Sequence, residues 1–196
     1  YDVVETEING TSFYVSRSGW TGERGFEIYS KNADFDGVGL WNYLLDKGKS
    51  AGLMGSDVSS MHIRRLEAGI LDYGTDIDQT LNPFEIGLER LVHLDKTDFI
   101  GRDALLETNQ KSIRLKGLVC EEASLIRGDR LLDSGEEIGM VTAGAWSPTL
   151  NSGIGLIRLV DSKPENYDLK VITLKGNFDA KVVELPFFDK EKLLSK

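Results

Sequence analysis

The chain is organised around residues 18–29, whose sequence is SGWTGERGFEIY. Its glycines give the first half the backbone freedom of a loop, and its second half alternates apolar and polar side chains as a strand does, with Phe26 and Ile28 on one side. Glu23 lies in the loop beside Trp20, where its carboxylate is placed to accept hydrogen bonds inside a pocket. Taken alone, the pattern is typical of a surface turn with a solvated glutamate, so a second motif has to decide between the two interpretations.

The second motif ends a predicted helix that begins at Ser56 or Asp57 and stops at the glycine of the sequence RLEAG. Arg64 and Arg65 lie near the C-terminus of this helix, where the helix dipole alone favours a cation. The turn that follows places Tyr73 between an aspartate and a glycine. This arrangement indicates a loop that covers a site.

Composition limits the classes of function. The 196 residues are 40% hydrophobic and 28% charged, which is typical of a globular protein with one large or two modest domains. The net charge of −9 argues against nonspecific binding to nucleic acid or to an anionic membrane, and no apolar run is long enough to span a bilayer. Cys120 is the single cysteine and lies in an apolar run, so we expect a buried thiol, no intrachain disulfide and a cytoplasmic location.

The first half of the chain predicts both strands and helices. Asn9 and Gly10 form a type I′ hairpin signal between two alternating segments. A helix is predicted over residues 34–48, with Asp34 as its cap and Trp41 in the core.

Shorter elements are predicted further along. A linking strand is expected at residues 51–55, a proline-started turn running into a strand at 83–92, and a short helix opened by residues 96–106. The polar residues 107–112 are interpreted as a domain boundary.

Beyond the boundary the pattern changes to short strands, with a hairpin turn at residues 133–135. Five or six strands with turns at this spacing are typical of a small barrel or sandwich. The predicted strands cover residues 113–119, 138–142, 154–160, 169–174 and 180–185. The fold class is therefore predicted as α+β, in two parts.

Taken together, the motifs resemble those of the glycine-cleavage T-protein (aminomethyltransferase) family. Residues 19–28 are similar to the family motif G-Y-T-G-E-x-G-F/Y-E-I, and residues 65–76 are similar to R-L-E-A-G followed by L-Y-G-x-D. Later landmarks of the family match in order at residues 83–88, 98–101 and 139–148. The resemblance covers the whole chain, and several ordered motifs make it specific.

The resemblance implies tetrahydrofolate-dependent one-carbon transfer. In the family the carboxylate of the G-Y-T-G-E loop holds the pterin edge, and Glu23 falls on that position. Arg65 and Tyr73 map to the folate site, and Trp20 replaces the motif tyrosine. The implied fold places the back half of a folate-binding α/β domain at residues 1–112 and a small antiparallel β-barrel at 113–196. The implied partners are folate and a one-carbon donor, which is a small molecule or a lipoyl carrier protein.

Two departures from the family pattern leave alternatives open. The family's catalytic aspartate precedes these motifs, whereas this sequence starts at Tyr1 within a strand pattern, so we expect a fragment that is inactive alone and assign it no catalytic residue. Arg90 stands where a tryptophan is common in the family. Together with Trp20, it leaves a folate-dependent demethylase of the same family as an alternative function. A folate-binding module without turnover is the alternative outside enzymes. His62 and His93 lack metal-ligand spacing, so no metal site is predicted.

Overall fold

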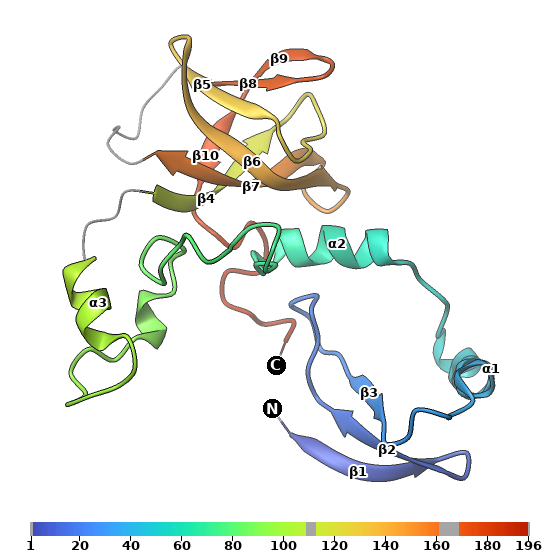
Figure 1. Ribbon diagram of the computed structural model, residues 1–196. Helices are drawn as coiled ribbons and strands as arrows, with labels where there is room; N and C mark the ends of the chain where they lie inside the picture. The colour runs from blue at the N-terminus through green and yellow to red at the C-terminus, as the bar shows by residue number, and fades with distance from the viewer. Residues whose placement is uncertain (1, 109–112, 161–168, 196) are drawn as a thin grey trace. The chain divides into compact units, whose positions relative to one another are not determined.

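The computed structural model describes residues 2–108, 113–160 and 169–195. The chain divides into two compact units (Figure 1). The first comprises Tyr1–Arg64 with Glu191–Lys196, and the second comprises Arg65–Lys190. The predicted domain boundary at residues 107–112 falls largely on 109–112, which lie outside the described residues, so it stays a prediction. Within the described ranges, no helix is long and apolar enough to cross a membrane.

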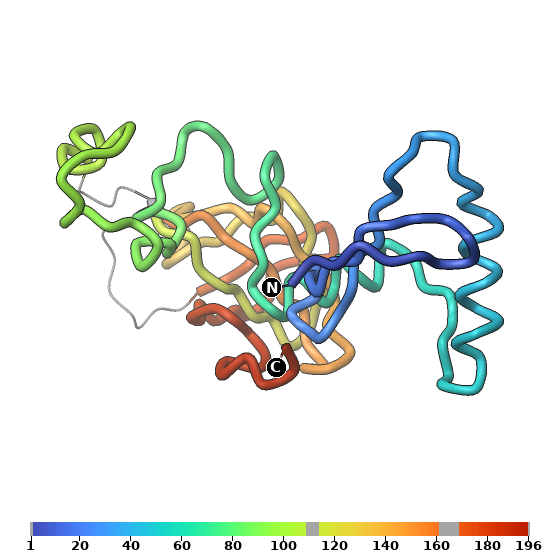
Figure 2. The backbone as a smooth tube through the Cα atoms, turned by 90° about the horizontal axis from the view of Figure 1, so that it is seen from below, coloured from blue at the N-terminus to red at the C-terminus, as the bar shows by residue number. Residues whose placement is uncertain are grey.

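A three-stranded antiparallel sheet forms the start of the first unit. Its strands are β1 (Val3–Ile8), β2 (Thr11–Ser16) and β3 (Glu27–Ser30), in that order across the sheet. The predicted hairpin is confirmed: Asn9 and Gly10 adopt φ values of 48° and 78° between β1 and β2, which lie side by side in Figures 1 and 2. Phe13 is buried and meets the ring of Phe35 edge-on, with centroids 5.9 Å apart.

Helix α1 (Gly37–Gly48) differs from its prediction in two ways. Its cap is Asp36 and not Asp34, because the carboxylate next to the first turn is the one that reaches the Gly39 N–H, at 2.8 Å. Trp41 is 52% exposed and not in the core, because α1 buries none of its residues. The strand predicted at residues 51–55 is also wrong: Ala51 ends a 3₁₀ helix, η1 (Lys49–Ala51), Gly52 turns the chain with a φ of 81°, and residues 53–55 form no regular structure.

Helix α2 (Val58–Glu67) carries the second motif and contributes residues to both units. Asp57 caps it as predicted, because its carboxylate accepts the Ser60 N–H at 3.0 Å. The helix gives way to a turn at Gly69, whose φ of 64° favours glycine.

The second unit begins with turns and short helices. The strand predicted at residues 83–92 is wrong: the segment forms turns and a 3₁₀ helix, η2 (Glu89–Leu91), because Gly87 adopts a φ of 73° that breaks an extended run. The short helix is confirmed as α3 (Arg102–Glu107). Residue 85 joins this region to the next, since the Glu85 carbonyl accepts the Leu115 N–H at 2.9 Å.

A curled antiparallel sheet of seven strands makes up the rest of this unit in the described part of the chain (Figure 1). The hairpin turn predicted at 133–135 is confirmed, with positive φ at Ser134 and Gly135. The sheet order is β10-β4-β7-β6-β5-β8-β9. The strands are β4 (Ile113–Cys120), β5 (Arg130–Asp133), β6 (Glu136–Ser147), β7 (Ser152–Val160), β8 (Leu169–Thr173), β9 (Gly176–Asp179) and β10 (Lys181–Val183).

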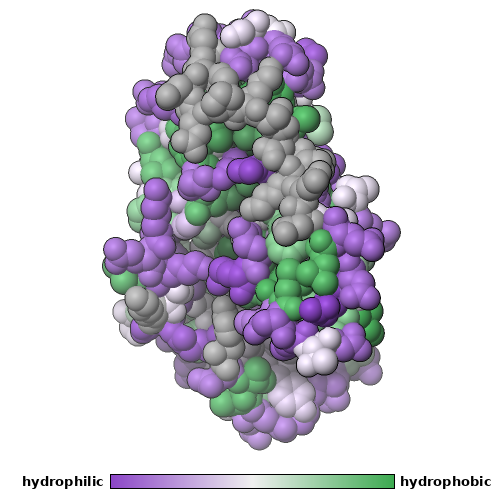
Figure 3. All heavy atoms as spheres, turned by 90° about the vertical axis from the view of Figure 1, so that its left-hand side faces the viewer, coloured by the Kyte–Doolittle hydropathy of each residue, from purple (hydrophilic) through white to green (hydrophobic). Residues whose placement is uncertain are grey.

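The main core lies inside this curled sheet. Its fully buried members include Leu118, Leu131, Val141 and Ile157, together with Cys120, whose predicted burial is confirmed. A second cluster joins Leu66 of α2 to Ala143, Ile154 and Leu156 of β6 and β7. On the face drawn in Figure 3, hydrophilic residues surround smaller hydrophobic patches. Leu66, in the last turn of α2 and in the second unit, therefore packs against β6 and β7.

Candidate functional site

The glycine-rich loop of the first unit is held at both of its ends. Gly22 supplies a φ of 75°, and the Arg24 N–H donates to the Leu194 carbonyl at 2.9 Å. Arg17, which precedes the loop, donates to the Ser195 carbonyl at 3.2 Å. The last residues of the chain thus fix the loop, a contact that no local sequence pattern signals.

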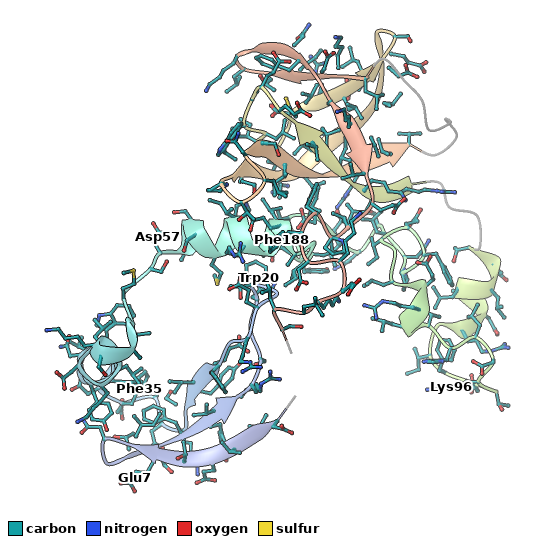
Figure 4. All side chains as sticks on the ribbon, turned by 180° about the vertical axis from the view of Figure 1, so that it is seen from behind. Glu7, Trp20, Phe35, Asp57, Lys96 and Phe188 are labelled. Carbon is teal, nitrogen blue, oxygen red and sulfur yellow. The ribbon has the colours of Figure 1, made fainter. Side chains whose placement is uncertain are left out.

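Glu23 forms an ion pair with Arg64 of α2 within the same unit. The Glu23 side chain remains 42% exposed and that of Arg64 29% exposed. The helix dipole alone explains a cation at Arg64, so the sequence pattern does not predict this ion pair. Glu23 and Arg64 lie 41 positions apart in the chain, beyond the reach of any local pattern. The carboxylate is therefore oriented by protein yet open to a ligand. Figure 4 labels Trp20 in the loop and Asp57 at the start of α2.

A polar network supports the loop from its strand end. The Ser18 hydroxyl donates to Ser16 Oγ at 2.8 Å and to the Glu27 carboxylate of β3. A hydrogen bond between the Tyr29 hydroxyl and the Glu27 carboxylate raises the pKa of Tyr29 above its ordinary value. Trp20, at the start of the loop, is half-buried. The Glu27 carboxylate therefore accepts a hydrogen bond within the fold, whereas the Glu23 carboxylate stays partly exposed.

Arg65 is 1% exposed and belongs to a buried polar cluster of the second unit. Its Nη1 donates to Asp76 Oδ2 at 2.7 Å and to the Ile70 carbonyl at 3.0 Å. Asp76 is fully buried and also accepts the Asp72 N–H at 2.9 Å and the Thr142 hydroxyl at 2.7 Å. The Arg65 guanidinium therefore stabilises the turn that follows α2. The negative charge of Asp76 offsets the cost of burying the positive charge of Arg65.

Tyr73 lies on the outer side of that turn and is 66% exposed. The turn is closed by a hydrogen bond of 2.8 Å from the Gly74 N–H to the Ile77 carbonyl. Arg158 of β7 holds the turn from the sheet side, with Nε and Nη2 donating to the Asp76 carbonyl at 3.0 and 2.9 Å. Arg158 also pairs with Asp78 at 2.9 Å. Hydrogen bonds from Thr80, followed by the Arg158 pair, lower the pKa of Asp78 to about 2.

The other residues of the RLE triplet also join α2 to the sheet. Glu67 is 1% exposed and accepts the Ser147 hydroxyl at 2.6 Å. Its carbonyl accepts the Phe188 N–H at 3.0 Å, and Phe188 is labelled beside the helix in Figure 4. Leu66, between the two charged residues, is fully buried in the second core cluster. The triplet therefore has a structural task that sequence analysis did not assign to it.

The four predicted site residues divide between the two units. Glu23 and Trp20 belong to the first unit, and Arg65 and Tyr73 belong to the second. The assignment of Glu23, Trp20, Arg65 and Tyr73 to folate binding stays a prediction. Across residues 2–108, 113–160 and 169–195, no group of three or more metal-ligating side chains could hold an ion.

The fold and these motifs define a class: an α+β protein that combines a loop-presented carboxylate with a C-terminal β-barrel. The model of the GCVT N-terminal domain matches residues 1–96, and that of the glycine cleavage T-protein C-terminal barrel domain matches residues 114–189. The chain therefore belongs to the glycine cleavage T-protein family, and the predicted α+β fold with a terminal barrel is confirmed.

Similar proteins agree with this assignment. The aminomethyltransferase of Pseudothermotoga lettingae is 35% identical over 191 residues, which are 96% of this chain and 52% of that protein. The aminomethyltransferase of Streptomyces coelicolor is 37% identical over 194 residues, with 94% and 52% covered. The crystal structure of glycine cleavage system aminomethyltransferase T from Bartonella henselae superposes with a TM-score of 0.78 at 27% identity, covering 91% of this chain and 50% of that one. The chain thus spans about half the length of the relatives it matches.

Proposed function

We propose that this chain is part of a tetrahydrofolate-dependent aminomethyltransferase and that Glu23 holds the pterin edge of the folate. The observation that carries the proposal is the Glu23–Arg64 pair on the glycine-rich loop, in which the carboxylate is fixed yet 42% exposed. The same activity is supported by membership of the T-protein family. It is also supported by aminomethyltransferase relatives that are 34%, 35% and 37% identical to this chain.

The Glu23 carboxylate matches the hydrogen-bond donors of tetrahydrofolate. The pterin presents its N3–H and its 2-amino group as parallel donors, and an ionised carboxylate accepts both in bidentate geometry. Trp20 borders the carboxylate in the loop and offers an apolar ring as a wall, although it lacks the hydroxyl of the family tyrosine. Tyr73, which is exposed on its turn, is also proposed as a folate contact.

Bound tetrahydrofolate supplies the amine nitrogens that take up the one-carbon unit. The residues of this chain bind and orient the cofactor, and no proton-transfer residue is assigned among them. We propose an aminomethylated lipoyl carrier protein as the one-carbon donor. This agrees with the similar Bartonella henselae protein, which is described as an aminomethyltransferase of the glycine cleavage system.

The ligand itself provides the test. Tetrahydrofolate and a 2-desamino analogue are titrated into the protein that contains this chain, and their dissociation constants are compared. Loss of one hydrogen bond to a charged group should weaken the analogue about ten- to a hundredfold. The matched control is Glu137→Gln, which removes the charge of another exposed Arg–Glu pair and should leave both constants unchanged. Equal affinity for the two ligands would remove the role of Glu23.

A further inference from the structure

The turn at residues 70–78 is held by side chains from three elements of the second unit. Arg65 comes from the last turn of α2, Thr142 from β6 and Arg158 from β7. All three converge on Asp76: two donate to its carboxylate, and the third donates twice to its carbonyl. The conformation of the turn is therefore set jointly by the helix and by two barrel strands.

The two sides of this turn differ sharply in exposure. Asp76 faces the barrel and is fully buried, and Arg65 beneath it is 1% exposed. Tyr73, three residues before Asp76, is 66% exposed. A ligand that approaches the turn meets Tyr73, whereas the guanidinium of Arg65 is covered by protein. Direct contact between a ligand and Arg65 would require the turn to open.

We propose that Arg65 is a positioning residue, which acts on the folate site through Asp76 by fixing the turn that presents Tyr73. The inference rests on the proposed function for its ligand and on the buried cluster for its mechanism. Thr142 and Arg158 take part in the same positioning, because they hold the same aspartate from β6 and β7. The inference also replaces the direct folate contact that the family motif suggested for Arg65.

Hydrogen exchange measured by mass spectrometry tests the positioning without any ligand. In Arg65→Lys, Thr142→Val and Arg158→Gln, amides of the turn such as Gly74 and Asp76 should exchange roughly ten- to a hundredfold faster, as expected for the loss of one hydrogen bond to a charged group. The matched control is Arg130→Lys, which alters an exposed arginine pair on β5 and should leave the turn unchanged. Unchanged exchange in all three variants would overturn the proposal. If Arg65→Lys does not fold, the variants of Thr142 and Arg158 decide the same point.

Binding then separates an indirect role of Arg65 from a direct one. Tetrahydrofolate and a tetrahydropterin without the glutamate tail are titrated into the parent protein, Arg65→Lys, Tyr73→Ala and the double variant. A positioning role predicts that Arg65→Lys weakens both ligands by the same factor and adds little in the Tyr73→Ala background, because residues that act as a unit are not additive. Weakening confined to the ligand with the anionic tail, or full additivity with Tyr73→Ala, would show direct contact and overturn the proposal.

The two arms also separate this inference from the proposed function. A parent protein that binds neither ligand contradicts the proposed function, whereas the exchange rates of the turn still report whether Arg65 positions it.

Discussion

Removal of the Asp76 carboxylate should strongly destabilise the second unit. Asp76 is fully buried and accepts hydrogen bonds from Arg65, Asp72 and Thr142 at 2.7–2.9 Å. Asp76→Ala breaks the buried ion pair between Arg65 and Asp76, which costs about 3–5 kcal/mol. The total stability of a domain is only about 5–15 kcal/mol, so the loss is a large fraction of it.

Urea unfolding followed by tryptophan fluorescence measures this loss. A chain with Trp20→Phe and Trp41→Phe retains only Trp146, on β6, and therefore reports on the second unit. With a urea dependence of about 1–3 kcal/mol per molar, the midpoint should fall by roughly 1–5 M or the unit should not fold at all. The comparison variant is Asp179→Ala, which removes an exposed partner of Lys170 and should change the free energy of unfolding by less than about 1 kcal/mol.

A double variant checks the physical cause. Arg65→Met with Asp76→Leu removes both charges and replaces them with apolar volume, which is often neutral or stabilising for a buried ion pair. It should recover most of the stability that Asp76→Ala loses. A loss below about 1 kcal/mol in Asp76→Ala would refute the reasoning, because breaking a buried ion pair costs more than that.

Three further changes test the fold. Gly153→Ala should cost about 1–3 kcal/mol in thermal unfolding, because its Cβ would lie 1.9 Å from the Ala123 carbonyl oxygen; an unchanged melting temperature would contradict the packing. Asp36→Ala should cost about 1 kcal/mol in urea unfolding through loss of the α1 cap, whereas Asp34→Ala should cost nothing measurable, and equal effects would contradict the cap assignment. The folded-state pKa of Asp78 lies near 2, below its ordinary 3.8, so the stabilisation by its carboxylate is complete above pH 4 and disappears as the pH falls from 3.8 to 2. The free energy of unfolding of Asp78→Asn should therefore depend less on pH across that window. An identical pH dependence in the variant and the parent chain would contradict the shift.

Local patterns predicted the hairpins and most of the barrel strands. Asn9 and Gly10 take positive φ values that a type I′ turn requires, and residues 133–135 turn where a serine and a glycine allow it. These predictions succeed because the turn chemistry is decided by neighbouring residues. The predicted strand at residues 83–92 fails for the same kind of reason, since the effect of Gly87 was not weighed against the apolar residues around it.

The contacts of the site were predictable only in part. The glycine-rich loop and the family motif pointed to Glu23, but its partner Arg64 lies on a helix distant in sequence. The RLE triplet was interpreted through its position at the folate site, whereas the structure gives each of its side chains a buried partner. Exposure of Trp41 was missed because an amphipathic pattern shows which side of a helix is apolar but not whether another layer covers it.

The most direct measurement for the proposed function is the affinity of Glu23→Gln for tetrahydrofolate, compared with that of the parent protein at one fixed pH. The substitution keeps the shape of the side chain but replaces one acceptor oxygen with a donor that faces the pterin's own donor. Loss of a charged hydrogen bond of about 1.5–3 kcal/mol predicts a dissociation constant roughly ten- to a hundredfold higher, with Glu137→Gln unchanged. Equal affinity in Glu23→Gln and the parent would contradict the assignment of Glu23 to the pterin.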